Sequence, residues 1–484
     1  MHHLHFLSQH GGRTADAPSV KGGIAVSAHA STAPPTQRLD DLIDGRPVGR
    51  FHVLVLALTG SVMFLDGLDT QAISFIAPAV AGEWGLPVAA LGPIFSASIA
   101  GLMIGYLAIA PLATKFGHRT VVIVSTALFG LVTIACAAAA DGTQLLALRL
   151  LTGVGLGAVI PSAVGLASEF APARRRSTFV MIIYCWLAAG FVAASLVSGA
   201  IIPAWGWRTV FVLAGALPLV LVLVLLRYLP ESPSYLVTRR PERAHATLRR
   251  LDPQLQPQTR LVLGDVRHDA DRRAPLVELF RRHWLLSTGL LWLAFMLNLA
   301  VFYAVQSWLP TILGQLGQPA SVSVTATALT TVGGIVAASV IGPMMDRRGP
   351  FTTLAVVYLL GAVFMTGFAG VISGASSQLL LAAAFLAGTC ITGGQMSVIA
   401  LAAVLYPPRI RSVGVGWALG IGRIGGIGGP LAVGFALGAG HPPRAVFLVM
   451  AAGLLVAAAA VVALARTSRS VRHLSAEPDP RPRR

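Results

Sequence analysis

Long apolar runs, separated by short polar segments, fill most of the chain. Twelve of them reach about 20 residues, enough to cross a bilayer core of about 30 Å. No polar faces accompany these runs, which excludes the buried helices of a soluble protein. The pattern predicts an all-α membrane protein whose twelve transmembrane helices lie at 51–79, 88–113, 120–140, 144–168, 177–202, 208–229, 284–313, 322–345, 351–372, 378–403, 412–437 and 443–465.

The charged residues are few and unevenly placed. They make up 11% of the chain, against about 25% in a typical soluble domain. A net charge of +17 could indicate a nucleic acid partner. However, 32 of the 36 Lys and Arg residues fall on one side of the bilayer if both termini are cytoplasmic. This asymmetry fits the positive-inside rule, predicts cytoplasmic termini and excludes a basic patch for nucleic acid.

Three polar segments flank or join the spans. They are a leader (1–50), a central loop (230–283) and a basic tail (466–484), which we expect to be cytoplasmic. The leader has no apolar core, so it is not a cleaved signal peptide, and its His, Ser, Ala and Pro content predicts disorder. The three cysteines lie inside spans and indicate packing residues, so we expect no metal site and no cofactor. The excess of Arg over Lys and the Ala, Gly and Val content suggest a bacterial inner membrane.

One short motif occurs twice at equivalent positions. The sequence PLATKFG at 111–117 follows the second span, and PMMDRRG at 343–349 follows the eighth. A constant offset of 232 residues predicts two parallel-related six-helix halves, 51–229 and 284–465, joined by the linker 230–283. Transporters built from such halves hold their substrate near the bilayer midplane, between the two halves.

Three charged residues stand at membrane depth, where ionisable groups are costly and usually functional. Asp66 and Asp69 lie three residues apart in the first span, so they project from nearly the same helix face. Two carboxylates this close do not ionise together easily, and one of them can bind and release a proton. Little separates the two for this role, with a slight preference for Asp69. Arg423, in the eleventh span, needs an anionic partner, either a substrate carboxylate or an aspartate of the first span. The alternative interpretations are an aspartate that only hydrogen-bonds between helices and a permanent structural ion pair.

Aromatic and amide side chains could complete a binding site. Rings can stack on an aromatic substrate while amides bond its polar groups. Each ring alone could equally be an anchor at the membrane interface. The candidates are Asn298, Tyr303, Gln306 and Trp308 in the seventh span and Tyr184 in the fifth.

Several of these motifs together resemble the major facilitator superfamily. They include the two loop motifs, the run RLLTGVGLG at 149–157 and PESPSYLV at 230–237. More specifically, DGLD at 66–69, QSWLP at 306–310 and GWALGIGRIG at 416–425 resemble the aromatic acid:proton symporters. The resemblance implies proton-coupled import of a benzoate- or hydroxybenzoate-like carboxylate by alternating access, with protons, this small substrate and the lipid bilayer as partners.

The resemblance also implies roles for charged residues near the span ends. Arg149 would take part in proton coupling, although an arginine near the interface could instead extend to lipid headgroups. Gating at the cytoplasmic mouth would involve Glu169, Lys115, Asp346, Arg347 and Arg348. Thr114 replaces the aspartate usual in the first loop motif, which puts the first half's charge network in doubt.

Two other functions fit the same sequence. A major facilitator carrier could transport another organic acid or a sugar-like compound, because PESPSYLV does not distinguish these cargoes. A membrane receptor for aromatic acids would need a signalling module, which neither the leader nor the tail displays. An enzyme is disfavoured because no nucleophile–base set occurs at membrane depth.

Overall fold

The computed structural model describes residues 36–256, 259–263, 279–280, 282–372, 374, 376–406 and 408–474. Twelve of its helices are long and apolar enough to cross a membrane, which confirms the predicted number. They are α2 (Arg50–Trp84), α3 (Leu91–Ala108), α5 (His118–Cys136), α6 (Gly142–Phe170), α7 (Arg176–Trp205), α8 (Trp207–Tyr228), α12 (Arg282–Gln315), α13 (Ala320–Arg348), α14 (Pro350–Val371), α15 (Ser377–Leu405), α16 (Pro408–Gly438) and α17 (Pro443–Leu474).

The two halves repeat one another in local geometry as well as in sequence. Gly117 precedes α5 with φ 89° and ψ 150°, and Gly349 precedes α14 with φ 86° and ψ 150°. Only glycine adopts this positive φ at little cost, so the turn explains why both loop motifs end in glycine. The matching turns follow the second long helix of each group of six, which confirms the fold of two related six-helix halves.

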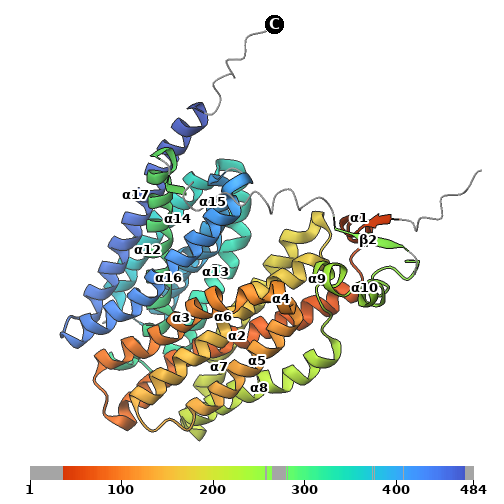
Figure 1. Cartoon of the computed structure of the whole chain (residues 1–484). Helices are drawn as coiled ribbons and strands as arrows, with labels where there is room; N and C mark the ends of the chain where they lie inside the picture. The colour runs from red at the N-terminus through yellow and green to blue at the C-terminus, as the bar shows by residue number, and fades with distance from the viewer. Residues whose placement is uncertain are drawn as a thin grey trace, which may run out of the picture.

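Each half is a bundle of paired helices (Figure 1). In the first half α2 packs on α7 and α3 packs on α6; in the second half α12 packs on α16 and α13 packs on α15. Three helix pairs join the halves, namely α3 with α16, α7 with α13 and α2 with α12. The two bundles diverge toward the end that carries α1, α9 and α10 (Figure 1).

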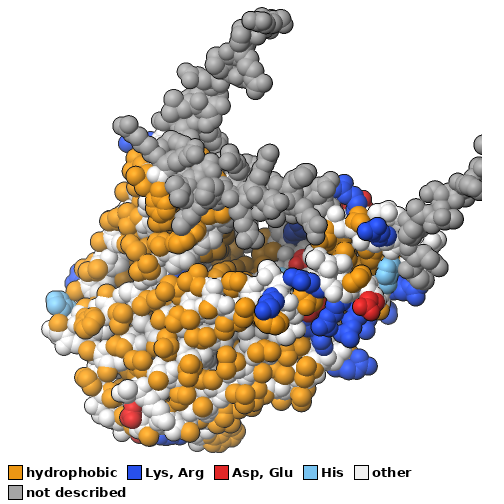
Figure 2. All heavy atoms as spheres, viewed as in Figure 1, with side chains coloured by type: hydrophobic (Ala, Val, Ile, Leu, Met, Phe, Trp, Pro, Cys, Tyr) orange, Lys and Arg blue, Asp and Glu red, His pale blue; other side chains and the backbone are white. Residues whose placement is uncertain are grey.

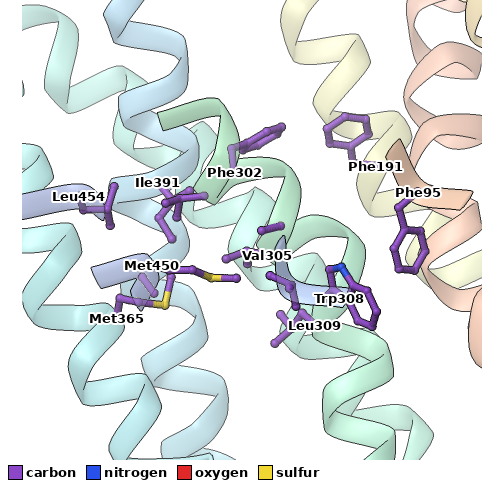
Figure 3. Close-up of a cluster of buried hydrophobic side chains, with 14 of the residues drawn as sticks. Phe95, Phe191, Phe302, Val305, Trp308, Leu309, Met365, Ile391, Met450 and Leu454 are labelled. Carbon is purple, nitrogen blue, oxygen red and sulfur yellow. The ribbon is translucent and has the colours of Figure 1, made fainter. Parts of the chain in front are cut away.

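At the opposite end, large apolar side chains hold the halves together. The ring of Phe95 meets that of Trp308 edge-on, with centroids 5.2 Å apart, and Trp308 is fully buried. Phe191 and Phe302 face each other across the same boundary at 6.4 Å (Figure 3). Ser96 adds a hydrogen bond, because its hydroxyl donates to the Ile427 carbonyl oxygen at 2.8 Å.

A small cap covers the diverging end of the first half. It consists of β1 (Thr36–Arg38), α1 (Leu39–Asp44), α9 (Pro233–Arg239), α10 (Pro241–Leu248) and β2 (Arg260–Val262). The strands β1 and β2 pair in parallel, and the apolar side chains of α1 pack on those of α9 and α10. Arg46 pairs with Asp252 at 2.6 Å, and Asp44 accepts a hydrogen bond from the Ala173 backbone N–H, also at 2.6 Å.

This cap corrects the expectation of a disordered leader over residues 36–44. Leu39, Leu42 and Ile43 are at most 4% exposed there, since the linker supplies the apolar surface that the leader alone lacks. The rest of that expectation, residues 1–35, lies outside the described residues. The linker is likewise partly ordered, as α9, α10 and β2.

Charge is concentrated at the capped end. Figure 2 shows Lys and Arg gathered over α9 and α10, whereas the sides of both bundles are mainly hydrophobic. We call this the basic end of the molecule. It is the end toward which the two halves diverge.

Candidate functional site

Asp69 is held in a fully buried ion pair. It lies on α2 and is 1% exposed, and Arg149 on α6 is 0% exposed. The Nη1 of Arg149 donates to both carboxylate oxygens, at 3.1 and 2.9 Å, and the Thr133 hydroxyl donates to Oδ1 at 2.9 Å. Arg149 therefore does not extend to lipid headgroups at the membrane interface, which was one of its two predicted positions. A guanidinium buried this deeply needs such a partner, because an isolated buried charge is prohibitively costly.

Asp66 has a different environment one turn away. It is also 1% exposed, and the Thr70 hydroxyl donates to its Oδ1 at 3.2 Å. Its Oδ2 is buried and has no hydrogen-bond partner among the described residues. Such a group can carry a proton, because the neutral carboxyl avoids burying an unpaired charge.

Arg423 lies on α16, half-buried, on the side of the helix that faces the first half. Its Nη1 donates to the hydroxyl of Tyr303 on α12 at 3.1 Å. Its guanidinium carbon lies over the ring of Tyr106 on α3, 5.9 Å from the centroid. No carboxylate of the described residues lies within ion-pair distance of it. Of the two predicted aspartate partners, Asp66 is close enough to interact with it electrostatically, without forming an ion pair.

Tyr184 on α7 completes this group of polar aromatic side chains. It is close enough to interact electrostatically with Arg423, Tyr106 and Tyr303. Tyr106 is the one member of this group that was not predicted from the sequence. A lone tyrosine near the end of an apolar run resembles an interface anchor, and no signal in the sequence links it to residue 423.

The other three predicted binding residues have partners or surroundings that differ from those of Arg423 and its tyrosines. Asn298 is fully buried, with neither amide atom bonded among the described residues, so it can still accept a polar partner. The side chain of Gln306 is engaged by Thr330 and Thr331, at 3.3 and 3.1 Å, and its backbone oxygen accepts from Gln71 at 3.0 Å. Trp308 donates to the Pro430 carbonyl oxygen at 3.0 Å, and together with its contact to Phe95 this gives it a packing role between the halves.

The predicted gating residues do not meet across the two halves in this conformation. Glu169 bonds within the first half, accepting from the Ser232 hydroxyl at 2.5 Å and the Ser234 backbone N–H at 3.2 Å. Its other oxygen lies 3.6 Å from His118 Nε2. The exposed side chains of Lys115, Asp346, Arg347 and Arg348 form no ion pair with the described residues.

Glu231, in the 230–237 segment, is a second residue whose role was not predicted from the sequence. Its Oε1 accepts from the backbone N–H of Arg119 at 3.0 Å and from that of Ser232 at 2.9 Å. Arg119 in turn donates to the carbonyl oxygens of Leu226 and Leu229 at the end of α8. The segment therefore ties together helix ends of the first half without help from Thr114, whose hydroxyl donates to the Pro111 carbonyl oxygen at 2.8 Å.

Comparison with known proteins identifies the family. The sequence model of the Major Facilitator Superfamily matches residues 59–374 and 326–483. The chain belongs to this superfamily. A solved structure of the xylose transporter XylE from E. coli, in a partially occluded inward open conformation, has the same fold. It matches with a TM-score of 0.67 at 15% identity, over 90% of this chain and 100% of that one.

Two curated relatives confirm the resemblance to aromatic acid carriers. The 4-hydroxybenzoate transporter PcaK of Pseudomonas aeruginosa is 38% identical over 82% of this chain and 90% of its own. The gallate transporter of Pseudomonas putida is 36% identical over 87% of this chain and 94% of its own. The major facilitator member described here is thus a multi-pass membrane transporter rather than an enzyme.

Proposed function

We propose that this protein imports an aromatic carboxylate, of the benzoate or hydroxybenzoate class, together with protons. The observation that carries the proposal is Arg423, a guanidinium at membrane depth with no carboxylate partner among the described residues. A carboxylate can bind such a group through two parallel hydrogen bonds. The names of the relatives, which are transporters of 4-hydroxybenzoate and gallate, supply the aromatic part of the proposal.

The proton is carried by Asp66 in this proposal. Asp69 is neutralised by Arg149, so protonating it would break a buried ion pair. Asp66 forms no ion pair with the described residues, since Arg423 acts on it only from a longer distance, and its buried Oδ2 is free to hold a proton. The sequence alone gave little to separate the two aspartates, with a slight preference for Asp69, and the surroundings now favour Asp66.

Transport proceeds by alternating access of the site between the two halves. The basic end faces the cytoplasm of a bacterial cell, as the positive-inside rule requires, and both termini lie there. The conformation described here is then closed on the outside, by contacts such as that of Phe95 with Trp308, and diverges toward the inside. Glu169, Lys115, Asp346, Arg347 and Arg348 would approach one another when the inner mouth closes.

Uptake into membrane vesicles tests this function. Vesicles containing the protein, given an inward proton gradient, should accumulate labelled 4-hydroxybenzoate, and a protonophore should abolish the accumulation. Unlabelled benzoate, hydroxybenzoates, phenylpropionates and sugars compete in the same assay. Competition by sugars alone, or binding without accumulation, would contradict the proposal in favour of a sugar carrier or a receptor.

A further inference from the structure

We propose that Tyr106 is a positioning residue for the substrate carboxylate, acting on Arg423 from the opposite half. The inference rests on the proposed function and adds a residue and a role to it. Its basis is the contact between the Tyr106 ring on α3 and the Arg423 guanidinium on α16, at 5.9 Å.

The directions of the two helices make this contact possible. The helices α3 and α16 pack together near the end opposite the basic end, where Ser96 bonds Ile427 and Gly92 lies against Leu431. They run antiparallel, and a helical side chain leans toward the N-terminus of its own helix. Tyr106 therefore leans away from the basic end and Arg423 leans toward it, so the two side chains converge.

The contact leaves N–H groups of the guanidinium free to bind a carboxylate. A guanidinium over the face of a tyrosine ring is stabilised by a cation–π interaction, which does not use up its N–H groups as hydrogen-bond donors. Tyr303 takes one hydrogen bond at the edge, from Nη1. The remaining N–H groups can bind a carboxylate, and the contact with Tyr106 holds the guanidinium in place for it.

The contact also crosses the boundary between the halves. Along α3 from Ser96 to Tyr106, the contacts with α16 include Ile99, which lies near Gly426, and then the pair of long side chains Tyr106 and Arg423. When the halves rock, the distance between Tyr106 and Arg423 changes more than the distances between α3 and α16 at the close-packed end. The orientation of the arginine, and so its affinity for a carboxylate, thereby depends on the conformational state.

The test compares KM and maximal rate of 4-hydroxybenzoate uptake at a fixed proton gradient. Tyr106→Leu removes the ring, and Tyr106→Phe keeps it. Loss of a cation–π contact of about 0.5–2 kcal/mol corresponds to roughly a 2- to 30-fold rise in KM. We expect this rise for Tyr106→Leu with a maximal rate within about twofold of wild type, and recovery of the KM in Tyr106→Phe.

A matched control exists at the protein surface. Tyr228 has the same kind of contact, with Arg227 at 5.3 Å from its ring, but is 49% exposed at the end of α8. Tyr228→Leu should leave KM unchanged. If Tyr106→Leu fails to insert, Tyr106→Met provides a second ringless variant of similar size.

Two results would overturn the positioning role, namely an unchanged KM in the ringless variants or a KM in Tyr106→Phe as high as theirs. Either result leaves wild-type uptake intact, so the proposed function would survive. Absence of aromatic carboxylate uptake by the wild type would instead remove the function itself.

Discussion

Asp66 and Asp69 show how strongly neighbours decide the role of one residue type. Both are buried carboxylates on one face of α2, yet of the two only Asp69 forms an ion pair with the described residues. Arg149 and Thr133 occupy both oxygens of Asp69, whereas Oδ2 of Asp66 has no partner among the described residues. This difference leads to separate predictions for the two residues.

Asp66→Asn should uncouple transport from the proton gradient. Asparagine resembles the neutral carboxyl in shape but cannot release a proton, so exchange of labelled for unlabelled substrate should persist while gradient-driven accumulation is lost. The exposed Asp40 on α1 supplies the control, because Asp40→Asn should accumulate substrate normally. Full accumulation by Asp66→Asn would rule out its role as proton carrier.

The effects of substituting Asp69 and Arg149 on the stability of the protein should be coupled. Removing one partner leaves an uncompensated buried charge, which costs about 3–5 kcal/mol. Asp69→Asn and Arg149→Met should therefore each lower the thermal unfolding temperature of the purified protein. The double variant should be less destabilised than the two effects added together, because it buries no unpaired charge. Simple additivity would mean that the pair does not couple.

At the scale of elements, backbone contact between helices limits which glycines can change. A Cβ at Gly425 would overlap the carbonyl oxygen of Met296, and one at Gly429 would overlap that of Ala300, so α16 lies directly on α12. These two helices also carry Arg423 and Tyr303. Their close approach therefore fixes the geometry of the candidate site.

Gly425→Ala should force α12 and α16 apart and lower both stability and uptake. Overpacking of this kind costs about 1–3 kcal/mol. Gly428 lies on the same helix with nothing within 4 Å of an added Cβ. Gly428→Ala should be neutral or stabilising, by up to about 1 kcal/mol, because alanine favours the helix. Equal thermal unfolding temperatures for the two variants would contradict the close contact.

The membrane-spanning helices could be predicted from the sequence, whereas most contacts between distant residues could not. The spans can be recognised because only continuous apolar runs are stable in lipid. Asp66, Asp69 and Arg423 can be recognised because charged residues are rare within spans. Tyr106 and Glu231 were missed because their meaning depends on residues more than 100 positions away. The cap was missed for the same reason, since Leu39 and Leu42 form a core only with residues of the linker.

At the scale of the whole molecule, the halves touch at one end and diverge at the other. A Cβ built on Gly199 of α7 lies 3.5 Å from the Cβ of Val324 on α13, within the range of a disulfide of about 3.5–4.5 Å. Paired cysteines at these positions, Gly199→Cys with Val324→Cys, should bond on oxidation and lock this end shut. Uptake should stop and then return with a reductant.

The control for this cross-link uses each single cysteine variant, which should keep transporting after oxidation. Cys185, the exposed native cysteine, is replaced by serine in all of them to prevent exchange. Normal uptake by the fully oxidised double variant would show that the halves need not separate at this end during transport.

The pairing of β1 with β2 also constrains how the protein is made. Thr36 pairs with Arg260, so roughly 220 residues and six membrane spans must be synthesised before the leader strand finds its partner. At about 5–20 residues per second, this interval is on the order of 10–40 s. During that time Leu39, Leu42 and Ile43 are without the apolar surface that later covers them. The leader is therefore a segment that a chaperone or a protease can reach until the linker has been synthesised.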